Sequence, residues 1–169
     1  TVDTGNLLKQ VTVEISAEDD AGSLAQRMAQ IGSRLLLETL TELDQGKLTA
    51  RAQDASKATL APKITKELCL IDWHRTASQI RSQVRALSPE PGATTTLNGQ
   101  VLKIYRCEVL MDRTDLVPGE VLIEGQAMIA GTAREGLSLT DIQIQGKTRM
   151  DVRTFLRGYR PRGKFQFTS

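Results

Sequence analysis

The sequence predicts an α/β segment followed by a mainly β domain. Residues 6–15 alternate between apolar and polar side chains, and residues 21–44 carry apolar side chains that mostly step by three and four. A strand followed by a helix is the repeating unit of α/β folds. After Gly92 the apolar pattern changes to period two, in several short runs separated by turn residues. Successive strands of this kind indicate a small antiparallel barrel.

The first part is expected to contain one strand and one long helix. Val11-Thr12-Val13, near the centre of the alternating run Asn6–Ile15, favours a half-buried strand because β-branched side chains pack well on a pleated surface. Asp19 or Asp20 is expected to cap the helix, and Gly46 to end it in a left-handed conformation. A single strand and helix cannot close a core, so we expect a partner segment to be missing from this sequence.

The middle of the chain is expected to form a linker and one amphipathic helix. Residues 48–60 show no clear apolar period and are rich in Ala, Thr, Ser and charge, which is typical of a connection. Asp72 is expected to cap the helix, which should end at Ser88 because Ser88 and Glu90 each precede a proline. Its apolar face is predicted to be Trp73, Ala77, Ile80, Val84 and Leu87.

The last part is expected to be built from short strands. Asn98-Gly99 lies between two strand-like runs, and this dipeptide is a strong hairpin signal. A break at Val117-Pro118-Gly119 and a turn at Arg134-Glu135-Gly136 separate later runs. Asp151 is expected to cap a final helix that stops at Gly158. The predicted strands are residues 94–97, 100–105, 107–111, 120–124, 127–129 and 137–144.

Composition narrows the class of protein. With 40% hydrophobic and 25% charged residues, the chain is expected to be globular. Only 4% of its residues are aromatic, which argues against a stand-alone RNA reader that stacks bases on aromatic side chains. Cys69 and Cys107 lie far apart without a companion histidine pattern, so we expect reduced thiols and no metal site. No apolar run approaches the about 20 residues that a membrane span needs, so we expect a cytoplasmic protein.

Several motifs along the chain resemble one known family. They are APKITKE at Ala61–Glu67, Ile71-Asp72-Trp73, and IRSQVRALSPEPGATT at Ile80–Thr95, followed by matches at Pro118–Leu122, Gly136-Leu137, Gly146–Met150 and Phe155–Gly158. This set is similar to the C-terminal domain of methionyl-tRNA formyltransferases. The resemblance covers essentially the whole chain, and its weight comes from the joint occurrence of the motifs.

The resemblance implies a domain organisation and an activity. Residues 1–47 would be the end of a Rossmann-like formyltransferase domain, residues 48–70 a linker, and residues 71–169 a C-terminal domain with an oligonucleotide-binding-like barrel that binds tRNA. The complete enzyme would transfer a formyl group from 10-formyltetrahydrofolate to the amino group of methionine on initiator tRNA. The chain opens at Thr1 without a methionine, so we expect a fragment that is monomeric, inactive alone and without most of the donor's pocket.

Asp3 is the candidate catalytic residue. By itself, Asp3-Thr4-Gly5 is ordinary turn chemistry. In the resembled family, however, the aspartate of a D-x-G motif works with an asparagine and a histidine that lie earlier in the sequence. Formyl transfer needs a base for the attacking ammonium, stabilisation of the oxyanion and a proton for the leaving nitrogen. His74, the only histidine here, matches no catalytic position of the family and is expected to be an exposed residue at a helix start.

Basic residues are the candidate tRNA contacts. Such clusters fit contacts with phosphates, which give affinity without reading sequence, although a solvated charged surface is the alternative. The resemblance implies that the lysines of the linker and the barrel face the inside of the L-shaped tRNA. The candidates are Lys63 and Lys66 in the linker, Arg81 and Arg85 on the central helix, and Lys147 and Arg149 near the end, where Arg153, Arg157, Arg160, Arg162 and Lys164 continue the basic tail.

Two other classes of protein remain open. A sugar-nucleotide formyltransferase shares the D-x-G motif and a barrel-like tail, but its acceptor is not a nucleic acid. A non-catalytic RNA-binding module would have no enzyme part ahead of this sequence. Binding of tRNA that weakens steeply with salt would argue against the sugar-nucleotide enzyme.

Overall fold

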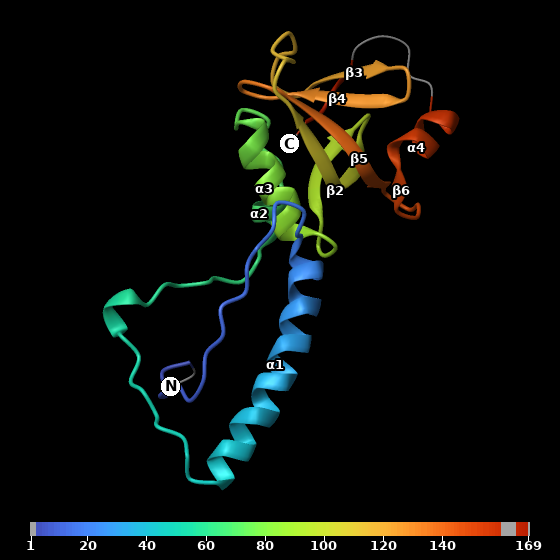
Figure 1. Cartoon of the computed structure of the whole chain (residues 1–169). Helices are drawn as coiled ribbons and strands as arrows, with labels where there is room; N and C mark the ends of the chain where they lie inside the picture. The colour runs from blue at the N-terminus through green and yellow to red at the C-terminus, as the bar shows by residue number, and fades with distance from the viewer. Residues whose placement is uncertain (1–2, 160–164, 169) are drawn as a thin grey trace. The chain divides into compact units, whose positions relative to one another are not determined.

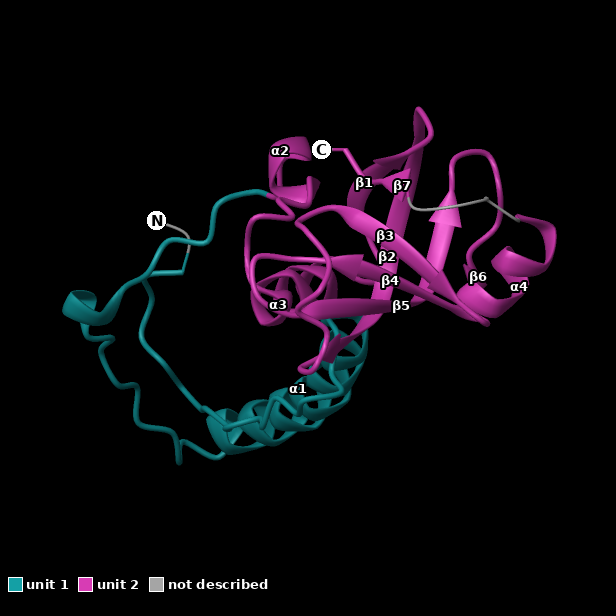
Figure 2. Ribbon diagram, turned by 90° about the horizontal axis from the view of Figure 1, so that it is seen from above, with its two compact units in different colours: residues 1–63 teal, residues 64–169 magenta. Residues whose placement is uncertain are grey.

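The computed structural model describes residues 3–159 and 165–168. Figure 1 shows the whole chain, which forms two compact units, unit 1 (Thr1–Lys63) and unit 2 (Ile64–Ser169), coloured separately in Figure 2. The division falls inside the stretch that was expected to be a linker. The bounds predicted for the linker and for the two domains stay a prediction.

Unit 1 contains one long helix, α1 (Ala21–Asp44). Asp20 caps it, since its carboxylate accepts from the backbone N–H of Ser23 at 2.8 Å while its own N–H donates to the Ser23 hydroxyl at 3.1 Å. At the other end Gly46 takes a left-handed conformation with φ 65°, and its N–H donates back to the carbonyl of Leu43. A glycine supplies this ending at little steric cost. The predicted helix, its cap and its stop are confirmed.

The strand predicted at Asn6–Ile15 is wrong. The described part of this segment forms an isolated antiparallel bridge between Leu7 and Arg51, with N···O distances of 2.8 and 2.9 Å, and no ladder. A strand needs a neighbouring strand along its length to pair its backbone groups, and the described residues of unit 1 supply none. An alternating pattern is therefore not enough to form a strand here.

The apolar side of α1 lies largely exposed within unit 1. Leu36, Leu40 and Leu43 are 58%, 52% and 53% exposed. Among the described residues of unit 1, no hydrophobic side chain is fully buried. A short 3-10 helix, η1 (Ala55–Lys57), is the other helical element of this unit. Unit 1 thus has an amphipathic helix without a core of its own.

Unit 2 begins with two helices, α2 (Lys66–Cys69) and α3 (Ala77–Leu87). The apolar face predicted for α3 is confirmed for its helical members, all of which are buried, and the helix ends at Ser88 as predicted. The predicted start is wrong, because Thr76 caps the helix in place of Asp72. The Asp72 carboxylate accepts from the backbone N–H of His74 at 3.0 Å and closes a turn ahead of the helix.

Trp73 lies in that turn and points into the core. It is 3% exposed, and its indole N–H donates to the hydroxyl of Thr95 at 3.1 Å. A buried indole needs such a partner because an unpaired buried donor is costly. Trp73 therefore belongs to the core of unit 2, as the helical spacing suggested, but it reaches the core from a turn.

The strands of unit 2 form one curled antiparallel sheet, which is a half-barrel (Figure 1). Its order is β1-β2-β5-β4-β3-β7, and β6 pairs with β5. The strands are β1 (Ala93–Leu97), β2 (Gln100–Leu110), β3 (Glu120–Glu124), β4 (Ala127–Gly131), β5 (Gly136–Ile144), β6 (Met150–Asp151) and β7 (Phe165–Gln166). The mainly β character of this unit is confirmed. A closed oligonucleotide-binding-like barrel stays a prediction, as does the Rossmann-like origin of unit 1.

The turn between β1 and β2 follows the sequence signal closely. Asn98 and Gly99 have φ values of 49° and 76°, so both central residues of this two-residue turn are left-handed, as the Asn-Gly signal requires. The predicted hairpin is confirmed. The last helix, α4 (Val152–Gly158), is capped by Asp151 as predicted, and it packs beside β5 and β6 (Figure 2).

The C-terminal segment joins two edges of the sheet. Val121 of β3 pairs with Phe165 of β7, and Thr168 exchanges backbone hydrogen bonds of 2.8 and 3.1 Å with Thr96 of β1. Between these pairings Phe167 is 3% exposed and stacks on Trp73, with the ring centroids 5.0 Å apart. Residues 165–168 therefore connect β3 to β1, a pairing that the sequence pattern did not predict.

Three further observations limit the kinds of site that the described residues can form. No helix in the described residues is long and apolar enough to span a membrane. No group of three or more His, Cys, Asp or Glu side chains gathers around a possible metal position in the same residues. Burial raises the pKa of the Cys107 thiol to about 12, although the positive charge of Arg81 opposes this effect. A buried thiol of this kind is chemically inert.

Candidate functional site

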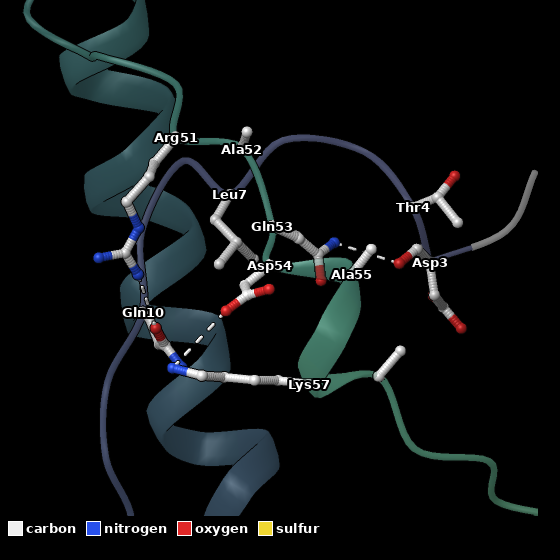
Figure 3. A pocket seen from close by; sticks show the side chains of 11 residues that line it. Asp3, Thr4, Leu7, Gln10, Arg51, Ala52, Gln53, Asp54, Ala55 and Lys57 are labelled. Carbon is white, nitrogen blue, oxygen red and sulfur yellow. Dashed lines mark hydrogen bonds and ion pairs between the residues drawn. The ribbon is translucent and has the colours of Figure 1, made fainter.

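The Asp3 turn lies beside a pocket of unit 1. Asp3 is exposed and has a left-handed backbone, with φ 62°. The side-chain amide of Gln53 donates to the backbone carbonyls of Asp3 and Gly5 at 3.1 and 2.7 Å. Figure 3 shows the carbonyl oxygen of Asp3 facing Gln53, while the Asp3 side chain leads away from it. The pocket measures about 720 Å³ and is lined by residues of the first ten positions and of positions 51–58.

Charged and polar pairs form the opposite wall of this pocket. Arg51 donates to the side-chain oxygen of Gln10 at 3.2 Å, and the Lys57 ammonium lies 3.7 Å from the Asp54 carboxylate (Figure 3). The hydroxyl and the N–H of Ser56 donate to Asp54 and hold the pKa of its carboxyl below its usual range. The only histidine of the sequence, His74, lies in unit 2, so unit 1 supplies no histidine for Asp3 to orient.

The linker lysines predicted to contact tRNA lie on either side of the boundary between the units, Lys63 at the end of unit 1 and Lys66 near the start of unit 2. Lys63 and Lys66 are both exposed. Lys66 is the first residue of α2, and Thr65 caps this helix. The side-chain amide of Gln83 on α3 donates to the carbonyls of Leu68 and Leu70 at 2.8 and 2.9 Å. Because these bonds tie α2 to α3, Lys66 is held at a defined place on the surface.

Arg81 and Arg85 lie one turn apart on α3, so they share a face of the helix. Both are half-buried. The charge of Arg81 reaches Cys107 of β2, as the effect on that thiol indicates. Gln83, which holds α2, is two residues from each arginine and therefore lies on the other side of α3. We call Lys66, Arg81 and Arg85 the first basic group because they lie on two connected helices, although they do not share one face.

Lys147 and Arg149 belong to a second basic group, in the turn between β5 and β6. Arg149 donates to the Asp141 carboxylate at 2.8 Å, and its guanidinium lies 4.4 Å from the centre of the Tyr105 ring. The Tyr105 hydroxyl donates to Gln143 at 2.7 Å, and the Gln143 amide donates to the carbonyl of Lys147 at 2.7 Å. This network fixes the turn and offsets part of the Arg149 charge, while the Lys147 side chain remains exposed.

The basic residues of α4 border two neighbouring pockets, of about 680 and 360 Å³. Arg153 lines both pockets and Arg157 lines the smaller one. The carboxylates nearby are already engaged: Glu124 accepts from Arg113 at 2.7 Å, and Asp151 caps α4. These two arginines extend the second basic group. Arg160, Arg162 and Lys164, which were predicted to continue it, lie outside the described residues.

The structure does not bring the two basic groups together. In Figures 1 and 2, α2 and α3 lie on one side of unit 2, and β6 with α4 lies on the other. The predicted contacts Lys66, Arg81 and Arg85 are thus separated from Lys147 and Arg149.

Three residues near these sites were not singled out from the sequence. They are Gln53, Tyr105 and Gln143, and each acts through a partner distant along the chain, such as Gln53 with Gly5. Gln53 lies in a stretch without apolar period, and Tyr105 and Gln143 occupy ordinary strand positions. No local signal marks them, because their roles depend on which segments meet.

Comparison with known proteins identifies the family. The formyl transferase C-terminal domain family matches residues 63–160. The chain is 40% identical over 161 residues to the methionyl-tRNA formyltransferase of Koribacter versatilis, covering 95% of this chain and 51% of that protein. It is 39% identical over 159 residues to the methionyl-tRNA formyltransferase of Bacillus subtilis, covering 93% of this chain and 50% of that protein. The chain therefore belongs to the formyl transferase C-terminal domain family, which confirms the resemblance, and it spans about half the length of the curated relatives it matches.

Solved structures share the fold at lower identity. HypX from Aquifex aeolicus superposes with a TM-score of 0.70 and 21% identity, over 91% of this chain and 28% of that chain. An N-formyltransferase from Helicobacter canadensis, solved with folinic acid and dTDP-3-aminofucose, gives a TM-score of 0.61 and 17% identity, over 82% of this chain and 51% of that chain. These likenesses establish the common fold.

Proposed function

We propose that the chain is the C-terminal half of a methionyl-tRNA formyltransferase and that it supplies the tRNA-binding part. The observation that carries this proposal is the 40% identity to a methionyl-tRNA formyltransferase over 95% of the chain. The complete enzyme transfers a formyl group to the amino group of methionine on initiator tRNA, at the start of translation. We further propose that it is a cytoplasmic monomer and that its curled sheet is an oligonucleotide-binding-like barrel.

The basic residues have the role of phosphate contacts in this proposal. Lys63 and Lys66 are exposed and lie on either side of the boundary between the units in the sequence. Arg81 and Arg85 add two positive charges on α3. Lys147 and Arg149 form the more distant group. A tRNA carries phosphates along its whole length and can touch both groups. Separated basic groups on one small domain are therefore better suited to a polyanion than to a small acceptor.

Asp3 has the role of the catalytic carboxylate. It needs an asparagine and a histidine from the preceding half, and the chain alone is inactive in this proposal. The formyl donor is 10-formyltetrahydrofolate. The pocket beside Asp3 does not fit it, because among the described residues the lining apart from Leu7 is small or polar and lacks an aromatic wall for a pteridine ring. We therefore assign no donor-binding residue to this chain and derive no step through the donor.

The kinetic test uses the complete enzyme with the double substitution Lys63→Ala and Lys66→Ala. We expect the KM for methionyl-tRNA to rise about tenfold with kcat nearly unchanged, because lost phosphate contacts weaken binding without touching the reacting atoms. Lys47→Ala, which removes another exposed lysine, is the matched control and should leave both constants unchanged.

An unchanged KM in the double variant would remove the linker lysines from the interface. Formylation of a dTDP-amino sugar in place of methionyl-tRNA would support the sugar-nucleotide alternative. Turnover by the 169-residue chain alone would contradict the assignment of the remaining catalytic groups to the preceding half.

A further inference from the structure

Gln53 holds the turn that carries Asp3. Its side-chain nitrogen donates both of its hydrogens, one to the carbonyl of Asp3 at 3.1 Å and one to that of Gly5 at 2.7 Å. The two acceptors flank Thr4, so a single amide group clamps three consecutive residues. The contact spans 48 to 50 positions of the sequence. It is a tertiary contact within unit 1 and does not arise from local turn geometry.

The backbone brings Gln53 to this position. Leu7 and Arg51 exchange two backbone hydrogen bonds of 2.8 and 2.9 Å in an antiparallel bridge. In an antiparallel register, a step of two residues from each partner places Gln53 opposite Gly5. The bridge and the Gln53 amide therefore act together, since the bridge sets the position of the side chain and the side chain holds the turn.

The conformation of Asp3 makes such a clamp necessary. Its φ of 62° lies in the left-handed region, which costs free energy for a residue with a Cβ. An exposed turn of this kind can exchange with other backbone conformations unless bonds hold it. A change of backbone conformation at Asp3 would redirect its carboxylate, because the side chain leaves the chain at that residue.

We propose that Gln53 is a positioning residue for Asp3, and that it aims the Asp3 carboxylate by clamping the turn. This inference rests on the proposed catalytic role of Asp3. Gln53 does not touch the reacting atoms in this account. It raises the fraction of enzyme in which the carboxylate is correctly placed, and small errors in placement are costly in catalysis.

The test compares Gln53→Met with Gln53→Lys in the complete enzyme. Methionine has a similar length but no donor, and we expect kcat to fall about five- to tenfold, the equivalent of roughly one hydrogen bond, with the KM for methionyl-tRNA and the melting temperature unchanged. Lysine keeps a donor and should restore part of the loss. Gln45→Met, at the end of α1, is the matched control and should behave as the unmodified enzyme.

A double-mutant cycle separates positioning from a general structural effect. If Gln53 acts only through Asp3, the enzyme with Asp3→Asn and Gln53→Met together is no slower than the enzyme with Asp3→Asn alone. A structural effect elsewhere would instead multiply with the loss from Asp3→Asn. Multiplying effects, or an unchanged kcat in Gln53→Met, overturn the inference.

The cycle also distinguishes this inference from the proposal on which it rests. If Asp3→Asn alone leaves kcat unchanged, the catalytic role of Asp3 is wrong and the role of Gln53 falls with it. If Asp3→Asn slows the enzyme while Gln53→Met does not, the role of Asp3 stands and only the clamp is rejected.

Discussion

Two adjacent aspartates ahead of α1 have different roles. Asp20 caps the helix, whereas Asp19 is 6% exposed and accepts from the Arg27 guanidinium at 2.6 and 2.8 Å and from the N–H of Ser16 at 2.7 Å. Arg27 also donates to the carbonyl of Glu14 at 2.7 Å. These bonds attach the segment before the helix to the helix itself. The sequence allowed either aspartate to be the cap, because the two differ only in where their side chains point.

We expect Asp19 to stay ionised where a free aspartate is protonated. The hydrogen bonds from Arg27 hold the pKa of Asp19 well below its usual range. A free aspartate titrates near about 3.9, so the contact stabilises the fold above about pH 4 and this contribution is lost as the pH falls through the lowered pKa. An NMR titration of the Asp19 side-chain carboxyl measures its pKa. Arg27→Met should raise the pKa, while Arg34→Met, an exposed arginine of the same helix, should not.

An Asp19 carboxyl that titrates with its midpoint at about pH 3.9 in the unmodified chain would contradict the contact with Arg27. The same holds if Arg27→Met leaves the midpoint of Asp19 in place. Neither result would affect the capping role of Asp20, which rests on separate hydrogen bonds.

At the scale of elements, predictions succeeded where the signal is local. The periods of α1 and α3, the caps of α1 and α4 and the Asn98-Gly99 turn are set by residues a few positions apart. They failed where the partner is lacking or where two nearby residues compete for the same role. The alternating run Asn6–Ile15 has no neighbouring strand among the described residues, and Asp72 closes a turn with His74 in place of starting a helix.

The pairing of the C-terminal segment is the clearest element that the sequence could not predict. β7 has two residues, too few for a periodic signal, and Thr168 pairs with Thr96, more than seventy positions away. Phe167 anchors this segment to the core of unit 2, because its ring is buried there and stacks on Trp73. The hydrogen bond from Trp73 to Thr95, which in turn donates to the carbonyl of Thr168 at 3.1 Å, ties the same residues together.

We expect Phe167→Ala to destabilise unit 2 by about 3–5 kcal/mol, since it removes a buried ring and leaves a cavity against Trp73. The free energy of unfolding in urea, followed by tryptophan fluorescence, measures the loss. Met111→Ala is the control, because Met111 is 68% exposed and its truncation should change stability by less than about 0.5 kcal/mol. Equal stability of the two variants would mean that the C-terminal segment does not close the core.

At the scale of the whole molecule, the net charge of +2 hides how charge is distributed. Many carboxylates are engaged locally, as Asp19 is with Arg27, Glu124 with Arg113 and Asp141 with Arg149. The exposed cations at Lys63, Lys66 and Lys147 and on α4 lie outside these pairs in the described residues. Composition alone therefore underestimates the attraction of unit 2 for a polyanion.

The candidate site could be predicted from the sequence only in part. Lys63, Lys66 and Asp3 were found because they lie within motifs that resemble a family, and a motif is a local property. The separation of the two basic groups, the clamp of Gln53 on Asp3 and the network of Tyr105 and Gln143 required the fold, since each depends on segments that meet in space.

The central claim is that exposed cations of this chain bind the phosphates of tRNA, and the salt dependence of that binding tests it most directly. We predict a steep linear fall of log K with log salt for initiator tRNA. The slope should be shallower by about 1.5 to 2 in the double variant of Lys63→Ala and Lys66→Ala, and unchanged in Lys47→Ala. Binding that is insensitive to salt, or a slope that the double variant leaves as it was, would contradict the account.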